Sequence, residues 1–357
     1  MGNSFRFISP LLRQGGSKPC FTKPDINRLL PRILTLKFWH GVNVYKKFMK
    51  SSQIVVFGSV NIDLTVTVSH LPQSGETLKG NNFTISVGGK GANQAIALSR
   101  LGTPTAFIGR VGKDNWGDRI LEELHQQGVN IDKFSQDVQH PTGTAMITVE
   151  EETGENQIII ISGANGVVGT KELLDLTNLL PHCRYLLLQL EIPLPVVLEA
   201  ITLAKKHHVP VILDPAPAHT LPHDIYQDIS IITPNAIEAS QLVGFEVQTQ
   251  AQVEKAGQWF LDKGVQTVII TMGADGVYCA SHHEQFWLST PPVTVVDTVG
   301  AGDAFNGGLA TALVNNYSLE EAVTWGLING SLSVTRKGEF PTLSEFQQWL
   351  KDNLNHQ

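Results

Sequence analysis

The stretch YLLLQLEIPLPVVLEAITLAKKHHVPVILDPAP, residues Tyr185–Pro217, contains two different patterns. YLLLQLE and VPVILDPAP are short apolar runs typical of buried strands, and the segment between them has apolar residues at helical spacing. The same alternation continues with ISIITPN, a helical segment and TVIITMG. Repetition of strand, helix and strand predicts an α/β fold, in which helices cover both faces of a mostly parallel sheet.

The sequence before this stretch predicts a second, smaller sheet. The α/β pattern already begins here, with two predicted strands, IVVFGSV and TAFIGRVG, and two predicted helices, GANQAIALSRLG and DRILEELHQQG. Short alternating strands near 64–69, 78–86, 144–150 and 157–161 do not fit it. The last two, TAMITVE and NQIIIIS, are typical of a hairpin. We expect the four strands to form a lid on an α/β domain that spans residues 53–350.

Positive charge is concentrated at the start of the chain. Residues 1–50 hold ten of the 26 basic side chains and one of the 33 acidic ones. The remainder therefore has 16 basic and 32 acidic side chains, a net charge of −16, so nucleic acid is not an expected partner. The basic leader at 1–50 is interpreted as a transit peptide, as sequence upstream of a true start at Met49, or as a structural arm.

Few residue patterns outside the motifs below suggest chemistry. The three cysteines, Cys20, Cys183 and Cys279, are widely spaced, which favours a reducing compartment. We therefore expect a cytoplasmic location, or an organelle if residues 1–48 are a transit peptide. No apolar run approaches 18 residues, so no membrane span is predicted. The histidine pairs at 207–208 and 282–283 lie in polar turns, where solvent-exposed side chains are expected rather than a metal site.

The segment VDTVGAGDAFNGG, Val296–Gly308, places a carboxylate in a glycine turn at a predicted helix start. It is neither a dinucleotide fingerprint, because residue 305 is Phe, nor a P-loop. Gly300 and Gly302 would let the N–H groups of 300–303 converge on an anion. Asp303 beside that anion could accept a proton from a hydroxyl that attacks a phosphate. The alternative interpretation is an ordinary helix cap.

Two N-terminal segments could hold the attacking hydroxyl. In GSVNIDL, Asn61 and Asp63 stand at alternate positions after the first strand, so both face the same side. An amide and a carboxylate together suit sugar hydroxyls, which donate and accept hydrogen bonds. VGGKGANQA brings a second glycine-rich segment, with Lys90 and Asn93, to a helix start. Alone, the first segment is equally consistent with a turn, and a glycine cluster at a helix start is more often a tight turn than a binding site.

These motifs resemble those of the PfkB-type carbohydrate kinases over about residues 53–345. Both parts of the family signature are present, GGKGANQA followed by Gly102 and Gly112, and DTVGAGDAFNGGLA. Six further motifs resemble those of family members that phosphorylate ribose rather than fructose. They are GSVNID, LPxxGET, QLE, PAPA, TPNxxE and VTRKG. The resemblance implies a Rossmann-like α/β domain whose lid forms a homodimer interface. It also implies transfer of the ATP γ-phosphate to O5 of D-ribose, with Mg²⁺ as cofactor and K⁺ as monovalent activator.

The resemblance further assigns roles to residues of this chain. Asp303 would be the base, beside an anion hole made by the backbone of Gly300, Ala301 and Gly302. The residues that would bind the sugar are Asn61, Asp63, Gly89, Lys90, Gly91, Ala92, Asn93, Glu191 and Asp303. Those that would bind ATP and its metal are Asn235, Glu238, Thr271, Gly273, Gly276 and Gly302. The potassium site would comprise Asp297, Val299, Ser333, Arg336, Gly338 and Thr342.

Two positions depart from the family pattern, and two other functions stay open. Leu327 stands where members often have His or Asn near the adenine, so an apolar contact is expected there. Asp214 replaces a frequent Asn, with little expected consequence. One alternative is a related kinase acting on another sugar or a nucleoside, although an Arg for a sugar acid or a stacking aromatic in the lid is not evident. The other is a non-catalytic sugar-binding regulator, which the intact motif around Asp303 disfavours.

Overall fold

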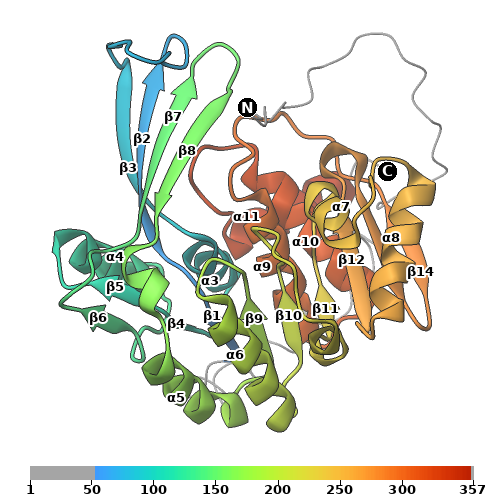
Figure 1. The fold of residues 1–357 in the computed structure, drawn as a ribbon. Coiled ribbons are helices and arrows are strands. Elements are labelled where there is room, and N and C mark those ends of the chain that lie inside the picture. The colour runs from blue at the N-terminus through green and yellow to red at the C-terminus, as the bar shows by residue number, and fades with distance from the viewer. Residues whose placement is uncertain (1–52, 355–357) are drawn as a thin grey trace.

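The computed structural model describes residues 53–354, so the basic leader predicted at 1–50 lies outside the described residues. Within them, the largest sheet has eight strands (Figure 1). They are β1 Ile54–Phe57, β4 Thr105–Ile108, β9 Tyr185–Leu188, β10 Val211–Leu213, β11 Ile231–Ile232, β12 Thr267–Thr271, β13 Val277–Ser281 and β14 Gln285–Leu288. Their order across the sheet is β14-β13-β12-β11-β10-β9-β1-β4. Across the sheet, every neighbouring pair from β4 through β1, β9, β10 and β11 to β12 is parallel. The β12–β13 and β13–β14 pairs are antiparallel. The prediction of a mostly parallel sheet is therefore confirmed.

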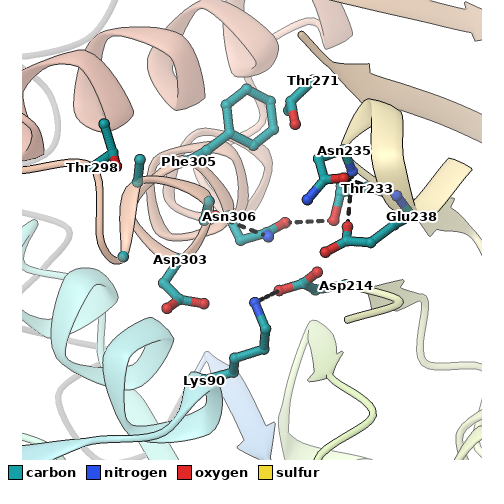
Figure 2. Close-up of a pocket in the computed structure, with 13 residues that line it drawn as sticks. Lys90, Asp214, Thr233, Asn235, Glu238, Thr271, Thr298, Asp303, Phe305 and Asn306 are labelled. Carbon is teal, nitrogen blue, oxygen red and sulfur yellow. Dashed lines mark hydrogen bonds and ion pairs between the residues drawn. The ribbon is translucent and has the colours of Figure 1, made fainter. Parts of the chain in front are cut away.

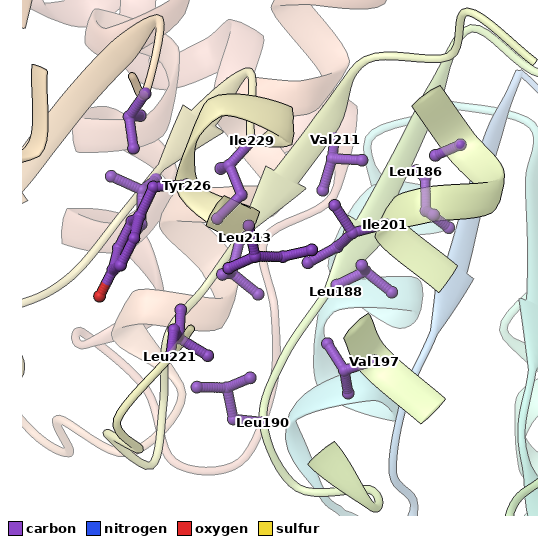
Figure 3. Packing of buried hydrophobic residues seen from close by; sticks show 14 of the residues in the cluster. Leu186, Leu188, Leu190, Val197, Ile201, Val211, Leu213, Leu221, Tyr226 and Ile229 are labelled. Carbon is purple, nitrogen blue, oxygen red and sulfur yellow. The ribbon is translucent and has the colours of Figure 1, made fainter. Parts of the chain in front are cut away.

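Helices cover both faces of this sheet. The helices are α3 Lys90–Arg100, α4 Asn115–Gln126, α5 Thr170–Leu179, α6 Leu194–Lys206, α7 Ala236–Val243, α8 Gln250–Asp262, α9 Ala301–Val314, α10 Leu319–Ser333 and α11 Leu343–Leu354. Because side chains alternate along a strand, Ile54 and Val56 of β1 belong to a core with α3, α4, α9, α10 and α11. Val55 and Phe57 belong to the opposite core, with α5, α6, α7 and α8. Figure 3 shows part of the second core, where α6 packs on β9 and β10.

A four-stranded lid sheet projects from the α/β body (Figure 1). Its strands, in the order β3-β2-β7-β8, are β3 Asn82–Gly88, β2 Asn61–Val68, β7 Thr144–Glu150 and β8 Asn156–Ile161. The β7–β8 hairpin is antiparallel, as predicted. Strand β2 begins three residues before the predicted 64, because Asn61 already pairs with Gly88. Strand β3 begins at Asn82 rather than at the predicted residue 78. The pairing of β3 with β2 stops at this end with Asn82 opposite Thr67.

The prediction of one strand for TAFIGRVG was wrong. Strand β4 ends at Ile108, and Arg110–Gly112 forms β5, which pairs with β6, Ser135–Asp137, in a separate two-stranded sheet. The break falls at Gly109, where a Cβ atom would lie 2.9 Å from the Phe134 ring and 3.0 Å from the Gly58 carbonyl oxygen. Only a glycine allows this close approach, and the chain changes sheets there.

Within the part of the chain that the structure describes, the helices are all too short or too polar to span a membrane.

Candidate active site

The central cavity lies at the carboxyl ends of the parallel strands, where open α/β sheets bind ligands. Asp214 directly follows β10, Thr233 directly follows β11, and Thr271 is the last residue of β12. The cavity has a volume of about 140 Å³. Its lining comprises Lys90, Asp214, Thr233, Asn235, Glu238, Thr271, Thr298, Gly300, Ala301, Gly302, Asp303, Phe305 and Asn306 (Figure 2).

Asp303 is a buried carboxylate in the first turn of α9, with 3% of its surface exposed. Its Oδ2 accepts a hydrogen bond from Asn93 Nδ2 at 2.9 Å, and its Oδ1 accepts one from Gln94 Nε2 at 3.1 Å. Gly300 occupies the N-cap position and Asp303 makes no capping bond, so the alternative of an ordinary cap is wrong. Burial raises the pKa of Asp303 to about 6, although the positive charge of Lys90 opposes the rise. A carboxylate with such a pKa can serve as a proton acceptor near neutral pH.

Lys90 points across the cavity toward a second buried carboxylate (Figure 2). Its Nζ lies 3.5 Å from Asp214 Oδ2, and the same oxygen accepts from Gln94 Nε2 at 2.8 Å. Burial alone would lower the pKa of Lys90, but the charges of Asp214 and Asp303 outweigh it and raise that pKa. Lys90 is therefore protonated. Burial raises the pKa of Asp214, and the charge of Lys90 opposes this effect.

Sequence reasoning missed Gln94. Its side chain is fully buried, and its amide nitrogen contacts the carboxylates of both Asp214 and Asp303. Gln94 in turn accepts a hydrogen bond from Gln189. A polar side chain at a buried position of α3, next to Asn93, was the signal that could have indicated it. Asp214, for which little consequence was expected, lies within this hydrogen-bonded group.

The glycine turn before α9 faces the cavity with its backbone. Gly300 has a φ of +76°, in the left-handed region, and a Cβ at Gly302 would meet no atom within 4 Å. The N–H groups at the start of a helix have no partner in a preceding turn, so this backbone suits an anion. One of the four N–H groups predicted to converge is already engaged, because Ala301 N donates to the Thr298 carbonyl at 3.3 Å.

The predicted nucleotide residues divide into two groups. Asn235 and Glu238 line the cavity and form a capping box at the start of α7. The Glu238 carboxylate accepts a hydrogen bond from the Asn235 backbone N–H, and Asn235 Oδ1 accepts one from the Glu238 backbone N–H, both at 2.9 Å. Burial raises the pKa of Glu238. Thr271 also lines the cavity, whereas Gly273 and Gly276, with φ of +56° and +100°, form the turn that follows it.

Two side chains predicted to bind the sugar line a neighbouring cavity of about 380 Å³. They are Asn61 at the start of β2 and Glu191 after β9. Glu191 Oε2 accepts from Ser59 Oγ at 2.5 Å and from the Lys90 N–H at 3.0 Å. This cavity also contains Ile160 of the lid, so the lid forms part of its wall.

Asp63 lies two residues along β2 from Asn61, in the lid rather than after the first strand. Its Oδ1 atom is buried and has no hydrogen-bond partner among residues 53–354. Burial, with a smaller contribution from the charge of Glu191, raises the pKa of Asp63 to about 7. A buried acceptor without a partner requires explanation, and a ligand hydroxyl would supply the missing donor.

The GGKGA segment has a packing role in addition to any binding role. A Cβ at Gly89, whose φ is +86°, would lie 2.8 Å from Val60 Cα, and one at Gly91 would lie 2.6 Å from the Ser59 carbonyl oxygen. Ala92 N donates to this same oxygen at 3.0 Å. These residues therefore hold the start of α3 against the turn between β1 and β2, which places Lys90 and Asn93 in the site.

The segments predicted to bind potassium lie side by side. The N–H groups of Val296 and Asp297 donate to the Val334 carbonyl at 2.7 and 3.2 Å, and Asp297 Oδ1 accepts from Val299 N at 3.0 Å. The Ser333 carbonyl accepts from Arg336 N at 3.4 Å. The side chains of Arg336 and Thr342 both contact Glu345, and Gly338 has a φ of +69°. The carbonyls and the Asp297 carboxylate of this group are ligands of the kind that suits a hard cation.

The sequence matches the pfkB family of carbohydrate kinases over residues 51–345. The chain belongs to this family. The ribokinase of Haemophilus influenzae is 39% identical over 301 residues, covering 84% of this chain and 98% of that protein. A deoxyribokinase of Salmonella typhi is 33% identical, with 84% and 99% covered. The structure of Arabidopsis thaliana ribokinase complexed with ribose and ATP superimposes on this chain with a TM-score of 0.78, and its sequence is 33% identical. The match covers 84% of this chain and 99% of the Arabidopsis chain.

The acidic cavity of this pfkB-family chain fits a divalent cation that arrives with a nucleotide. Asp214, Glu238 and Asp303 face it, and Lys90 is its one lining cation among the described residues. No group of three or more His, Cys, Asp and Glu side chains in residues 53–354 is arranged to hold a metal by itself. A magnesium ion here would therefore take most of its ligands from phosphate and water, with Asn235 and Glu238 nearby.

Proposed function

We propose that this chain transfers the γ-phosphate of ATP to O5 of D-ribose and forms ribose 5-phosphate. The observation that carries this proposal is the placement of Asp303, a buried carboxylate whose pKa is raised to about 6, next to the glycine backbone at the start of α9. Membership of the pfkB family and the similarity to ribokinases support it. We also propose a cytoplasmic location, or an organelle if residues 1–48 are a transit peptide, because the widely spaced cysteines favour a reducing compartment.

In this reaction Asp303 accepts the proton of O5 as that oxygen attacks the γ-phosphate. Asn93 and Gln94 hold its two carboxylate oxygens, so the base is oriented before the sugar binds. The backbone from Gly300 to Gly302 and the ammonium of Lys90 stabilise the charge that spreads over the transferring phosphoryl group. Mg²⁺, bound with ATP, would neutralise phosphate charge.

The sugar lies between the α/β body and the lid in this proposal. Asn61, Asp63 and Glu191 supply hydrogen-bonding groups, and Ile160 supplies an apolar wall. A closed lid excludes water, so the γ-phosphoryl group of ATP is transferred to the sugar and not to water, and ADP leaves. We also propose that two chains pair through their lids, because the outer strand β8 is exposed along its whole length.

A coupled assay of ADP production with D-ribose, 2-deoxyribose, fructose and adenosine tests the proposed function. We expect the highest kcat/KM with D-ribose. A higher value with 2-deoxyribose would make the chain a deoxyribose kinase, in line with its similarity to the deoxyribokinase. Sugar binding without turnover of any of the four would indicate a non-catalytic regulator.

Potassium should activate the enzyme through the 297–300 segment. Asp297 and the carbonyls near Ser333 lie beside the turn that leads into α9, so a bound K⁺ would order the anion-binding backbone. Replacing K⁺ by Na⁺ or Li⁺ at constant ionic strength should lower kcat several-fold. Equal initial rates in the three chloride salts would contradict this assignment, and the Asp297→Asn variant should lose the K⁺ response.

A further inference from the structure

Asn165 lies where the lid joins the α/β body. It follows the end of β8 by four residues, within the short 3₁₀ helix η2, Gly163–Val167. The start of β2, at Asn61, and the segment that leads into β7, at Gly143, meet it there. Asn165 is 98% buried, since only 2% of its surface is exposed. A polar side chain in such a position is retained for the hydrogen bonds it makes.

The side chain of Asn165 makes three hydrogen bonds to two consecutive residues. Its Oδ1 accepts from Val60 N at 3.0 Å, and its Nδ2 donates to the Val60 carbonyl at 2.8 Å. The amide thus pairs with both backbone groups of Val60, as a neighbouring strand would. The second Nδ2 proton goes to Asn61 Oδ1 at 2.9 Å.

Packing leaves little room for another arrangement at this point. A Cβ at Gly143 would lie 2.3 Å from Asn165 Nδ2 and 2.4 Å from Asn61 Oδ1. A Cβ at Gly163, whose φ is +50°, would lie 2.3 Å from the Pro141 carbonyl oxygen. The two glycines therefore bring the ends of β7 and β8 directly over the Asn165–Asn61 hydrogen bond.

This bond determines which atom of Asn61 is presented to the cavity. Asn165 Nδ2 can only donate, so Asn61 must turn its oxygen toward Asn165 and its NH₂ group away from it. Both side chains line the cavity that also contains Glu191. Asn61 therefore offers donors to a sugar hydroxyl, and Glu191 offers an acceptor.

We propose that Asn165 is a positioning residue for sugar binding, which fixes the donor face of Asn61 toward the sugar and anchors the base of the lid to Val60. The proposal deepens the proposed function and rests on it. Asn165 lines the cavity of Asn61 and Glu191 and not the cavity that contains Asp303, so its effect should fall on the sugar and not on ATP.

The isosteric variant Asn165→Asp tests this role. Aspartate keeps the acceptor for Val60 N but has no proton for the Val60 carbonyl or for Asn61 Oδ1, so the Asn61 amide should rotate and present its oxygen to the sugar. We expect the KM for D-ribose to rise about tenfold or more, which corresponds to about 1.4 kcal/mol or more of lost binding. The KM for ATP should stay within about twofold of wild type. Asn178→Asp, an exposed position on α5, is the matched control and should leave both constants unchanged.

Two further variants separate positioning from a loss of stability. Gly143→Ala breaks the same hydrogen bond without altering either asparagine, and should give the same selective rise in the ribose KM. In an Asn61→Ala background, Asn165→Asp should add no more than about twofold, because coupled residues are not additive. An unchanged ribose KM in Asn165→Asp, or equal increases in both KM values together with a lower Tm, would overturn the proposal. If wild type prefers another sugar, the D-ribose proposal fails alone and the comparison is made with that sugar.

Discussion

Replacing Asp303 by Asn should lower kcat for D-ribose by about 10²–10⁴-fold, the usual contribution of a positioned general base. Asparagine has nearly the same size, its oxygen can still accept from Gln94, and the Asn93 amide can flip to accept from its NH₂ group, so the cavity keeps its shape. It cannot accept a proton from O5. Since the attacking hydroxyl stays protonated, the loss appears in kcat, and the affinity for ribose should remain close to wild type. Steady-state kinetics and ribose binding by calorimetry measure the two effects.

The control for this variant is Asp132→Asn, an exposed carboxylate outside both cavities. It should retain wild-type kcat. If Asp303→Asn kept more than about a tenth of wild-type turnover, Asp303 would not be the base. A raised ribose KM with unchanged kcat would instead make Asp303 a sugar-binding residue only.

The layers of the fold follow from local sequence patterns. Apolar runs such as those of β9 and β10 contain their own strand signal, and α6 between them has its own helical spacing. The breaks in strands could not be predicted in the same way. Gly109 ends β4 because Phe134 and Gly58 pack against it, and Phe134 lies 25 residues further along the chain. A strand pattern gives no information on such distant neighbours.

In the candidate site, too, residues in an unusual local motif could be predicted from the sequence, and residues that matter through distant contacts could not. Asp303 stood out in the sequence because a carboxylate in a glycine turn is locally unusual. Gln94 and Asn165 did not stand out, because their importance comes from partners about 100 or more residues away. Gln94 reaches Asp303, and Asn165 reaches Asn61. Side chains that orient other side chains are recognised only when the fold brings the partners together.

Exposed apolar side chains on the lid lead to the second large expected effect. Ile158, Ile159, Ile160 and Ile161 of β8 are 52%, 64%, 55% and 44% exposed. Among the strands that the structure describes, β8 is also an edge of the lid sheet, so one side of its backbone has no strand partner there. Large apolar patches on soluble proteins mark interaction surfaces. A second copy of the lid, related by a twofold axis, would cover this edge on both chains.

Introducing two charges into β8, Ile159→Asp with Ile161→Asp, should convert the proposed lid-paired dimer to monomers. Ile160 lines the sugar cavity, so its neighbours Ile159 and Ile161 point to the opposite face of the strand, and the new charges do not enter the cavity. A lid without its partner loses support and closes less completely over the sugar. We therefore expect a several-fold increase in the ribose KM, with a smaller effect on the KM for ATP.

Sedimentation velocity at micromolar concentration measures the oligomeric state of wild type and variant, and steady-state kinetics measure the two KM values. The matched control is Val138→Asp with Leu174→Asp, which introduces two charges at exposed apolar positions outside the lid. This control should remain dimeric with an unchanged ribose KM. A wild-type monomer would contradict lid pairing and would leave the chemistry at Asp303 unaffected. A dimeric Ile159→Asp, Ile161→Asp variant would place the interface elsewhere, because two buried, unpaired carboxylates on each chain could not be accommodated in a lid–lid contact.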